Sequence, residues 1–228
     1  MKLSNPFKDL TKFELCLWLC SSCLILIFNL FSGVDSLLSG CVSIIGVTSL
    51  IFIAKGRVFG HVLGLVFAIS YGIISLWFKY YGEMITYMGM SAPIALFSIF
   101  SWLKNPYNDT KEVKVSTLSK MQLFITVSGS VIVTVAFYFI LKAFDTACLI
   151  ISTISVTTSF IASFLSLCRS RFYAIAYALN DIVLIILWLI ASSYDFSYFS
   201  LVLCFIVFLF NDIYAFYNWG KMRKRQSK

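Results

Sequence analysis

The stretch L-N-D-I-V-L-I-I-L-W, residues 179–188, places an asparagine and an aspartate inside an otherwise apolar run. Residues 210–219, F-N-D-I-Y-A-F-Y-N-W, repeat the pattern, and in both copies a tryptophan follows the first asparagine by eight positions. Apolar runs of this kind are candidate membrane spans. An ionisable group at bilayer depth costs about 2.5–3.5 kcal/mol, so it faces a cavity or a partner. The two copies therefore predict a membrane bundle with polar groups in its interior.

The composition indicates an integral membrane protein along the whole chain. Apolar residues make up 60% of the 228 positions, charged residues make up 12%, and the mean hydropathy is +0.92. Globular domains contain about 25% charged residues. Stretches long and apolar enough to span a bilayer occur at 13–32, 36–54, 58–78, 84–103, 121–141, 146–168, 172–192 and 197–219. We therefore expect an all-α integral membrane protein with eight transmembrane helices, in which residues 1–228 form a single polytopic domain.

The basic residues divide unevenly between the two sides that eight spans define. The side with both termini receives sixteen of the eighteen Lys and Arg residues, namely Lys2, Lys8, Lys12, Lys55, Arg57, Lys104, Lys111, Lys114, Lys120, Arg169, Arg171, Lys221, Arg223, Lys224, Arg225 and Lys228. The other side receives Lys79 and Lys142. The positive-inside rule then predicts cytoplasmic termini in a bacterial inner membrane. The net charge of +8 reflects this topology and attraction to anionic membrane lipid, and it does not indicate nucleic-acid binding.

The first span has an alternative interpretation. Its flanking lysines and the F-S-G at residues 31–33 would also fit a cleaved signal peptide. Its apolar stretch is longer than a usual signal core, so we expect the chain to keep it as an extra helix.

The chain also contains an internal repeat. S-I-I-G-V-T-S at 43–49 aligns with S-T-I-S-V-T-T at 152–158, and I-F-S-W at 99–102 corresponds to F-Y-N-W at 216–219. This predicts two three-helix units, 36–103 and 146–219, joined by a linking helix at 121–141 and preceded by the extra helix at 13–32. One linking helix gives both units the same orientation. Such parallel repeats are typical of transporters, with the substrate site near the midplane between the halves.

Helical spacing predicts two facing polar stripes on the last two spans. Spacings of three, four and seven put residues on one helix face, and they select Tyr173, Tyr177, Asn180, Asp181, Leu184 and Trp188, and then Asn211, Tyr214 and Asn218. We expect the polar and aromatic members to bind a substrate. Asp212 is turned about 100° from Asn211, so we expect it to serve helix packing instead.

A pocket of amides, phenols, an indole and a carboxylate suits a flat heteroaromatic ligand with hydroxyl groups. A cationic ring would also gain cation–π attraction and a counter-charge. The alternative is that the Asn and Asp side chains only hydrogen-bond the helices together.

The remaining motifs argue against a metal, a cofactor or catalysis. Cys16, Cys20 and Cys23 lie on one helix, but there is no second cluster and only one histidine, so we expect no metal site. Neither an H-E-x-x-H motif nor a P-loop is present. The second aspartate follows Leu-Phe-Asn instead of the Gly-x-Gly of intramembrane aspartyl proteases. We therefore expect a protein that is not an enzyme and needs no cofactor.

Several short motifs, in this order, resemble the PnuC-type nicotinamide riboside transporters. They are L-T-K-F-E at 10–14, A-K-G at 54–56, Y-Y-G-E at 80–83, Pro93, Trp102, Asn180 with Trp188, and N-x-I-Y-x-F-x-N-W at 211–219. The resemblance implies a SWEET-like three-plus-one-plus-three fold, often trimeric. It also implies uptake of a vitamin-like nucleoside by facilitated diffusion, after which a cytosolic kinase traps the substrate.

The chain departs from this family pattern at the expected site. The usual W-x-x-W before the central asparagine is Tyr173-x-x-Ala176, a usual asparagine is Phe67, and a usual glutamine is Ala95. We expect nicotinamide riboside or a closely related nucleoside or vitamin as the substrate. Thiamine or a deoxynucleoside is the alternative within the family, and a non-transporting membrane sensor or structural subunit is the alternative outside it.

Overall fold

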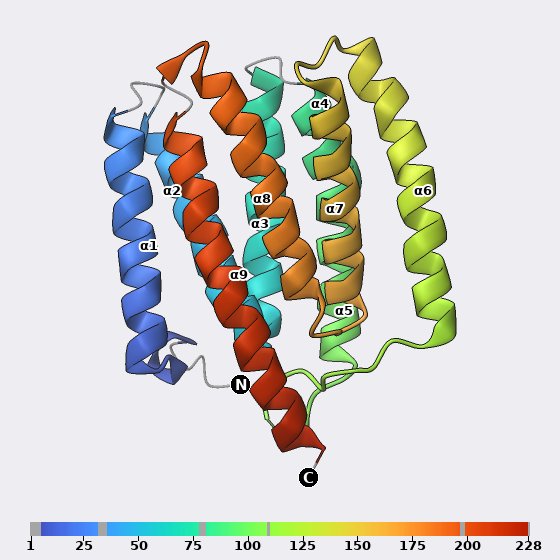
Figure 1. Ribbon diagram of the computed structural model, residues 1–228. Helices are drawn as coiled ribbons and strands as arrows, with labels where there is room; N and C mark the ends of the chain where they lie inside the picture. The colour runs from blue at the N-terminus through green and yellow to red at the C-terminus, as the bar shows by residue number, and fades with distance from the viewer. Residues whose placement is uncertain (1–5, 32–35, 78–80, 109, 197–198, 228) are drawn as a thin grey trace.

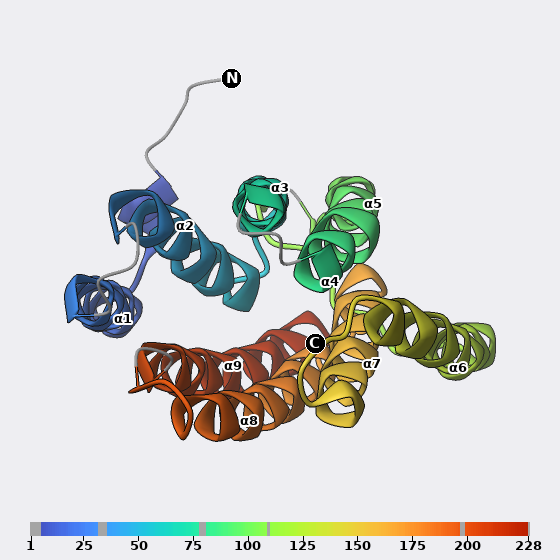
Figure 2. The same ribbon diagram turned by 90° about the horizontal axis from the view of Figure 1, so that it is seen from above.

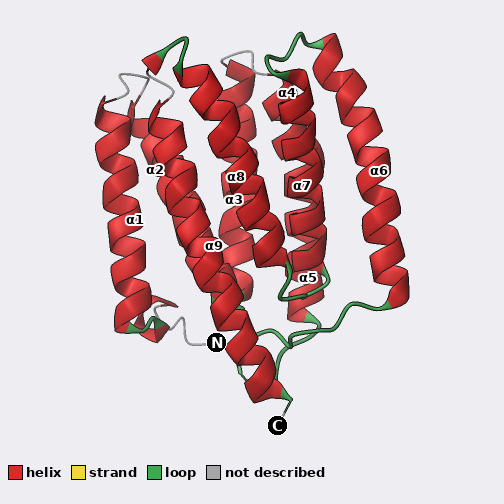
Figure 3. Ribbon diagram, viewed as in Figure 1, coloured by secondary structure: helices red, strands yellow, loops and turns green. Residues whose placement is uncertain are grey.

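A computed structural model of the chain describes residues 6–31, 36–77, 81–108, 110–196 and 199–227. Figure 3 shows these residues as helices joined by loops. The elements in order are a 3₁₀ turn η1 (Pro6–Asp9), α1 (Lys12–Phe31), α2 (Ser36–Ala54), α3 (Val58–Trp77), α4 (Tyr81–Met84), a π-helical segment η2 (Ile85–Ser91), α5 (Ala92–Leu103), α6 (Lys120–Ala143), α7 (Leu149–Leu167), α8 (Tyr173–Ser192) and α9 (Phe199–Gln226).

The predicted all-α fold with eight spans is confirmed for the described residues. α4, η2 and α5 form one continuous rod, Tyr81–Leu103, so the elements give eight rods at the predicted places. Six of the rods are long and apolar enough to cross a membrane within their described residues. The main difference in bounds is α9, which continues beyond the predicted end at residue 219 and carries the basic residues Arg223, Lys224 and Arg225 in its last turn.

The helices form two rows that face each other, as Figure 2 shows. One row contains α2, α3 and α5, and the other contains α7, α8 and α9, with α1 and α6 at opposite ends of the bundle. The first helix of each row packs against the last helix of the other row: α2 contacts α9, and α7 contacts α5. This crossed packing is expected of a parallel repeat whose axis runs along the helices.

η1, at the start of the described residues, and the C-terminal end of α9 lie at the same end of the bundle (Figure 1), which we call the terminal end. The loop at 104–119 crosses this end and bonds to both rows. The Val113 amide donates to the Gly56 carbonyl at 2.9 Å, and the Ser116 amide donates to the Arg169 carbonyl at 3.0 Å. The described residues of this loop therefore connect the two rows at the terminal end.

The fourth span contains a π-helical segment that the sequence patterns did not predict. At its end the Ala92 amide bonds to the Tyr87 carbonyl, five residues earlier. Pro93 follows at the start of α5 and has no N–H to continue a regular ladder. The wider turn sets the side chains of Tyr87 and Ser91 on the interior of the bundle, and such segments are frequent at functional sites.

The close packing of α3 on α2 depends on Gly60. A Cβ atom at this position would lie 2.5 Å from the Ile53 backbone nitrogen and 2.8 Å from the Ser49 carbonyl oxygen. The Ser49 hydroxyl also donates to the Gly60 carbonyl at 2.8 Å. The two backbones therefore touch without an intervening side chain, as small residues permit in membrane helices.

We predict that Gly60→Ala destabilises the protein by about 1–3 kcal/mol, because the added methyl group has to push backbone atoms apart. Thermal unfolding of the purified protein in detergent measures the loss. Gly220→Ala in α9 is the matched control, since its Cβ would meet its nearest neighbour, the Arg171 guanidinium, at 3.8 Å. Equal melting temperatures for the two variants would show that the α2–α3 contact is looser than described.

Candidate functional site

A cavity of about 170 Å³ lies between the two rows and is lined from all six of their spans. Its wall includes Ser49 of α2, Phe67 of α3, Tyr87 of η2, Ser163 of α7, Asn180 of α8 and Asp212 of α9. Its described lining residues include neither Lys nor Arg. This is the position between the halves at which a parallel repeat places its substrate, so we treat this cavity as the candidate site.

A second cavity of about 300 Å³ lies at the terminal end, between η1, the α2–α3 turn and the loop at 104–119. Acidic and basic groups both line it, among them Asp9 and Arg57, which form an ion pair at 3.1 Å. Loop residues and the helix ends of α2, α3 and α5 line it, so it lies at the end of the bundle and not between the two rows. We therefore do not assign the substrate to it.

The structure brings most of the predicted α8 stripe to the inner cavity. Tyr173, Tyr177, Asn180, Asp181 and Leu184 all line it, whereas Trp188 is not part of its wall. Side chains of α7 hold two of these groups in place. The Thr158 hydroxyl donates to Asn180 Oδ1 at 2.8 Å, and the Ser163 hydroxyl shares a hydrogen bond of 2.8 Å with the Tyr177 hydroxyl.

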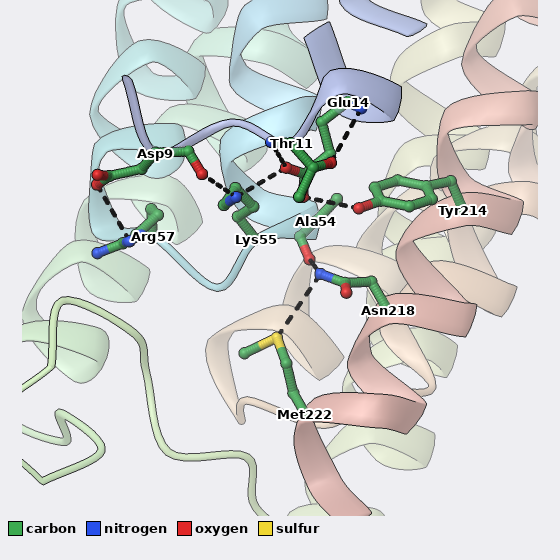
Figure 4. Close-up of polar contacts among 9 residues, drawn as sticks. All are labelled: Asp9, Thr11, Glu14, Ala54, Lys55, Arg57, Tyr214, Asn218 and Met222. Carbon is green, nitrogen blue, oxygen red and sulfur yellow. Dashed lines mark hydrogen bonds and ion pairs between the residues drawn. The ribbon is translucent and has the colours of Figure 1, made fainter. Parts of the chain in front are cut away.

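The structure corrects the predicted orientation of the α9 stripe. Asn211 donates to the Ser21 hydroxyl of α1 at 3.1 Å. In Figure 4 the Tyr214 hydroxyl donates to Glu14 at 2.7 Å, and Asn218 donates to the Ala54 carbonyl at 2.9 Å. These three side chains face α1 and α2 instead of the cavity. The physical reason is that α1 packs on α9 and supplies polar partners, which a comparison of the last two spans alone leaves out.

Asp212 faces the cavity in place of Asn211, contrary to the prediction that it serves only packing. Its carboxyl group and that of Asp181 line the same cavity. Both residues are only 4% exposed. No donor from the described residues reaches Asp181 Oδ2. The second N-D pair therefore contributes its acid, and not its amide, to the site.

Sequence reasoning missed several cavity residues from the other helices, including His61, Tyr87 and Ser163. His61 is 6% exposed and lies within hydrogen-bond distance of the Ser166 hydroxyl, at 3.3 Å. The sequence did contain a signal for His61, because it is the only histidine of the chain. The serines of α7 carry no comparable signal, since Ser is common in membrane-helix contacts.

Below the cavity, the two units exchange paired hydrogen bonds at the terminal end. The Ser101 hydroxyl and the Trp102 indole donate to the carbonyls of Leu167 and Ser166, both at 2.9 Å. In the other direction, the Asn218 amide and the Trp219 indole donate to the carbonyls of Ala54 and Ile53, at 2.9 and 3.0 Å. The aromatic clusters that end the two predicted repeats therefore bind the first helix of the opposite unit.

The same two indoles form an aromatic layer under the cavity. Their ring centroids are 5.4 Å apart. His61 meets Trp102 edge to face at 4.3 Å, and Tyr173 meets Trp219 in the same way at 4.9 Å. His61 and Tyr173 line the inner cavity, and Trp102 lines the cavity at the terminal end. The layer therefore separates the two spaces.

We predict that Trp102→Phe and Trp219→Phe each lower stability by about 1–3 kcal/mol, because each removes a buried indole hydrogen bond and leaves a gap where the larger ring packed. Thermal unfolding in detergent is the measurement. Trp77→Phe is the control, since that indole is 67% exposed, and we expect it to melt like the unaltered protein. A loss of the same size in all three variants would show that the crossed bonds add nothing.

Comparisons with known proteins agree with this architecture. Residues 36–221 match the family model described as nicotinamide mononucleotide transporter. A protein of Neisseria mucosa named nicotinamide riboside transporter PnuC is 27% identical over 198 residues, which cover 85% of this chain and 75% of that protein. A protein of the same name from Haemophilus influenzae is 24% identical over 195 residues, 84% of this chain and 82% of the relative.

A solved structure titled as the crystal structure of the vitamin B3 transporter PnuC superimposes with a TM-score of 0.79. It is 26% identical, and the match covers 96% of this chain and 95% of the other. The extra helix α1 is therefore inside the matched region, as is the three-plus-one-plus-three bundle.

Proposed function

The chain belongs to the nicotinamide mononucleotide transporter family, and from this we propose that it carries nicotinamide riboside across the membrane by facilitated diffusion through the inner cavity. The family is one of transporters, so the chain is a multi-pass membrane transporter and not an enzyme. The observation that carries the choice of substrate is the charge of the cavity wall. Asp181 and Asp212 line it, and its described lining residues include no Lys or Arg.

This charge favours a nucleoside over its phosphorylated form. Nicotinamide riboside carries one positive charge on its pyridinium ring, which the acids of the cavity attract. The mononucleotide adds a phosphate of about −1.5 to −2. Phosphate groups in proteins are usually held by Arg, Lys or backbone N–H groups at helix ends. The cavity offers a phosphate two carboxyl groups and no Lys or Arg side chain.

The rest of the wall fits the remainder of such a ligand. Phe67, Tyr87 and Phe205 give aromatic surface, on which a cationic ring gains cation–π attraction. Asn180 and Ser163 are polar groups that can bond to ribose hydroxyls. Thiamine is the second candidate, because it also combines a cationic ring with a flat heteroaromatic ring. A neutral deoxynucleoside makes no use of the acid pair.

A binding panel tests this proposal. Titration calorimetry on the purified protein should show nicotinamide riboside bound at least tenfold more tightly than nicotinamide mononucleotide and than neutral deoxynucleosides. Thiamine in the same panel separates the two cationic candidates. Tighter binding of the mononucleotide would overturn the charge argument, and tighter binding of a deoxynucleoside would replace the substrate.

The two asparagines of the N-D pairs should differ in the same assay. We expect Asn180→Ala to weaken binding at least tenfold, about 1.4 kcal/mol, because a polar pocket is left with an unpaired ligand group. Asn211→Ala is the comparison, since its amide bonds to Ser21 and the Val207 carbonyl outside the cavity. It should lower the melting temperature and leave affinity within about twofold.

We also propose that the terminal end lies on the cytoplasmic side of the cell membrane. The support is the positive-inside rule, because fourteen of the fifteen Lys and Arg residues that the structure describes lie in the elements and loops at this end. A fluorescent protein fused to the C-terminus should therefore fold and fluoresce. A C-terminal alkaline phosphatase fusion that is active in the periplasm would contradict this orientation.

A homotrimer remains part of the proposal as an expectation from the family resemblance. The outer faces of α5 and α6 are apolar and exposed, with Phe97 of α5 at 60% and Phe124 of α6 at 67%. Such faces fit either lipid or another protomer. Light scattering on the detergent-solubilised protein measures the number of chains.

A further inference from the structure

An arginine between two aromatic rings joins the start of α8 to the end of α9. The Arg171 guanidinium, just before α8, lies 5.0 Å from the ring centroid of Phe172 and 5.3 Å from that of Phe216 on α9. Both distances are within the range of cation–π attraction. A Cβ atom at Gly220 would lie 3.8 Å from Arg171 Nη1, so the guanidinium packs directly against α9. Aromatic and backbone contacts therefore position this cation at the terminal end.

The guanidinium of Arg171 has no polar partner among the residues that the structure describes. Its side chain forms no ion pair or hydrogen bond with any of them, and its buried Nε has no acceptor. The described acids of the terminal end already pair with other bases, namely Asp9 with Arg57, Glu14 with Lys55, and Glu112 with Arg225. A guanidinium carries several N–H donors. This half-buried group therefore has donors left for an acceptor from outside the chain.

A second cation without an acid lies next along α9. Lys221 follows Gly220, and its Nζ is 4.3 Å from the ring centroid of Tyr217. It forms no ion pair with a described residue. Lys224 is exposed three residues further on, which places it on the same helix face. Because α9 extends past the other helices at this end (Figure 1), these cations lie beyond the apolar part of the bundle.

An exposed apolar face leads from these cations along the outside of α9. Phe210, Ile213 and Tyr217 are each more than half exposed. They precede Lys221 by eleven, eight and four residues, so all of them share its helix face. Leu179 of the neighbouring helix α8 is also more than half exposed. The surface therefore combines an apolar face of several helical turns with cations at its terminal end.

From this geometry we propose that the outer surface of α8 and α9 at the terminal end binds an anionic phospholipid. Its phosphate lies between Arg171 and Lys221, and its acyl chains run along the apolar face of α9. Arginine binds phosphate with two parallel N–H bonds, and basic pockets between membrane helices hold anionic headgroups. The inference goes beyond the proposed function and does not depend on which substrate the protein carries.

The apolar face decides between a lipid and a free phosphate. A free phosphate would use only the cations and would leave Phe210, Ile213 and Tyr217 without a ligand. A phospholipid uses both parts of the surface at once. A zwitterionic headgroup adds its own cation beside the phosphate, and that cation is repelled by Arg171 and Lys221. The surface therefore favours a headgroup with a net negative charge.

Thermal unfolding of the full-length protein in detergent tests the preference for anionic lipid. Phosphatidylglycerol and phosphatidylcholine with the same acyl chains are added separately, and inorganic phosphate is added in a third sample. A ligand that binds the folded state raises its stability. We expect phosphatidylglycerol to raise the melting temperature by at least about 3 °C, and the other two additions to give less than half of that rise. Equal rises with the two lipids, or with inorganic phosphate, overturn the proposal.

Two matched variants assign this effect to Arg171. Arg171→Gln should lose at least half of the rise produced by phosphatidylglycerol. Arg225→Gln is the control, because it removes the same charge from the same end of the bundle, where Arg225 already pairs with Glu112. It should keep the rise. Equal losses in both variants would show general attraction to a basic surface and overturn the site. If Arg171→Gln does not fold, Lys221→Gln tests the same point against the same control.

Discussion

The cavity depends on the crossed hydrogen bonds at the terminal end, because they satisfy the ends of two helices that meet inside the bundle. The last carbonyl groups of a helix have no partner within it, and in a membrane water does not replace that partner. Ile53 and Ala54 end α2, and each of their carbonyls receives a donor from α9. Because α5 does the same for α7, each unit caps the other. The two rows are thereby held together at one end while the space between them stays open above the aromatic layer.

The repeat supplies a symmetric frame, but the polar groups of the site are not symmetric. Asp212 lies seven residues before Trp219, and the position seven residues before Trp102 is Ala95. Asp181 and Asn180 of the second unit face Phe67 and Ala68 of the first across the same cavity. Both carboxyl groups of the site therefore come from the second unit, while the described lining residues of the first unit include polar, aromatic and apolar side chains but no acid. A cationic ring is drawn toward one side of the cavity, which gives the ligand a preferred orientation that a symmetric pocket would not define.

The sequence predicted the spans and the α8 stripe because both depend on local periodicity. Each span is a continuous apolar run, and Tyr173, Tyr177 and Asn180 share a face at any crossing angle. The α9 stripe depends on which neighbour each face meets, and periodicity does not contain that information. Asn211 and Asp212 point about 100° apart on α9. Only the position of α1 decides that Asn211 faces α1 and that Asp212 faces the cavity. The buried Glu14 was the available signal, since an acid at the start of a span needs partners such as Lys55 and Tyr214.

The energetics of the acid pair suggest that function, and not stability, keeps it. Each intramembrane acid costs about 2.5–3.5 kcal/mol, and replacing buried ionic groups by well-packed apolar ones is often neutral or stabilising. Stability has other sources here, because the Gly60 contact and the indole bonds hold the helices without the pair. Ala68 and Ala95 line the same cavity from the first unit and show that its wall accommodates small apolar side chains. An acid at position 212 is therefore a cost that a cationic ligand in the cavity offsets.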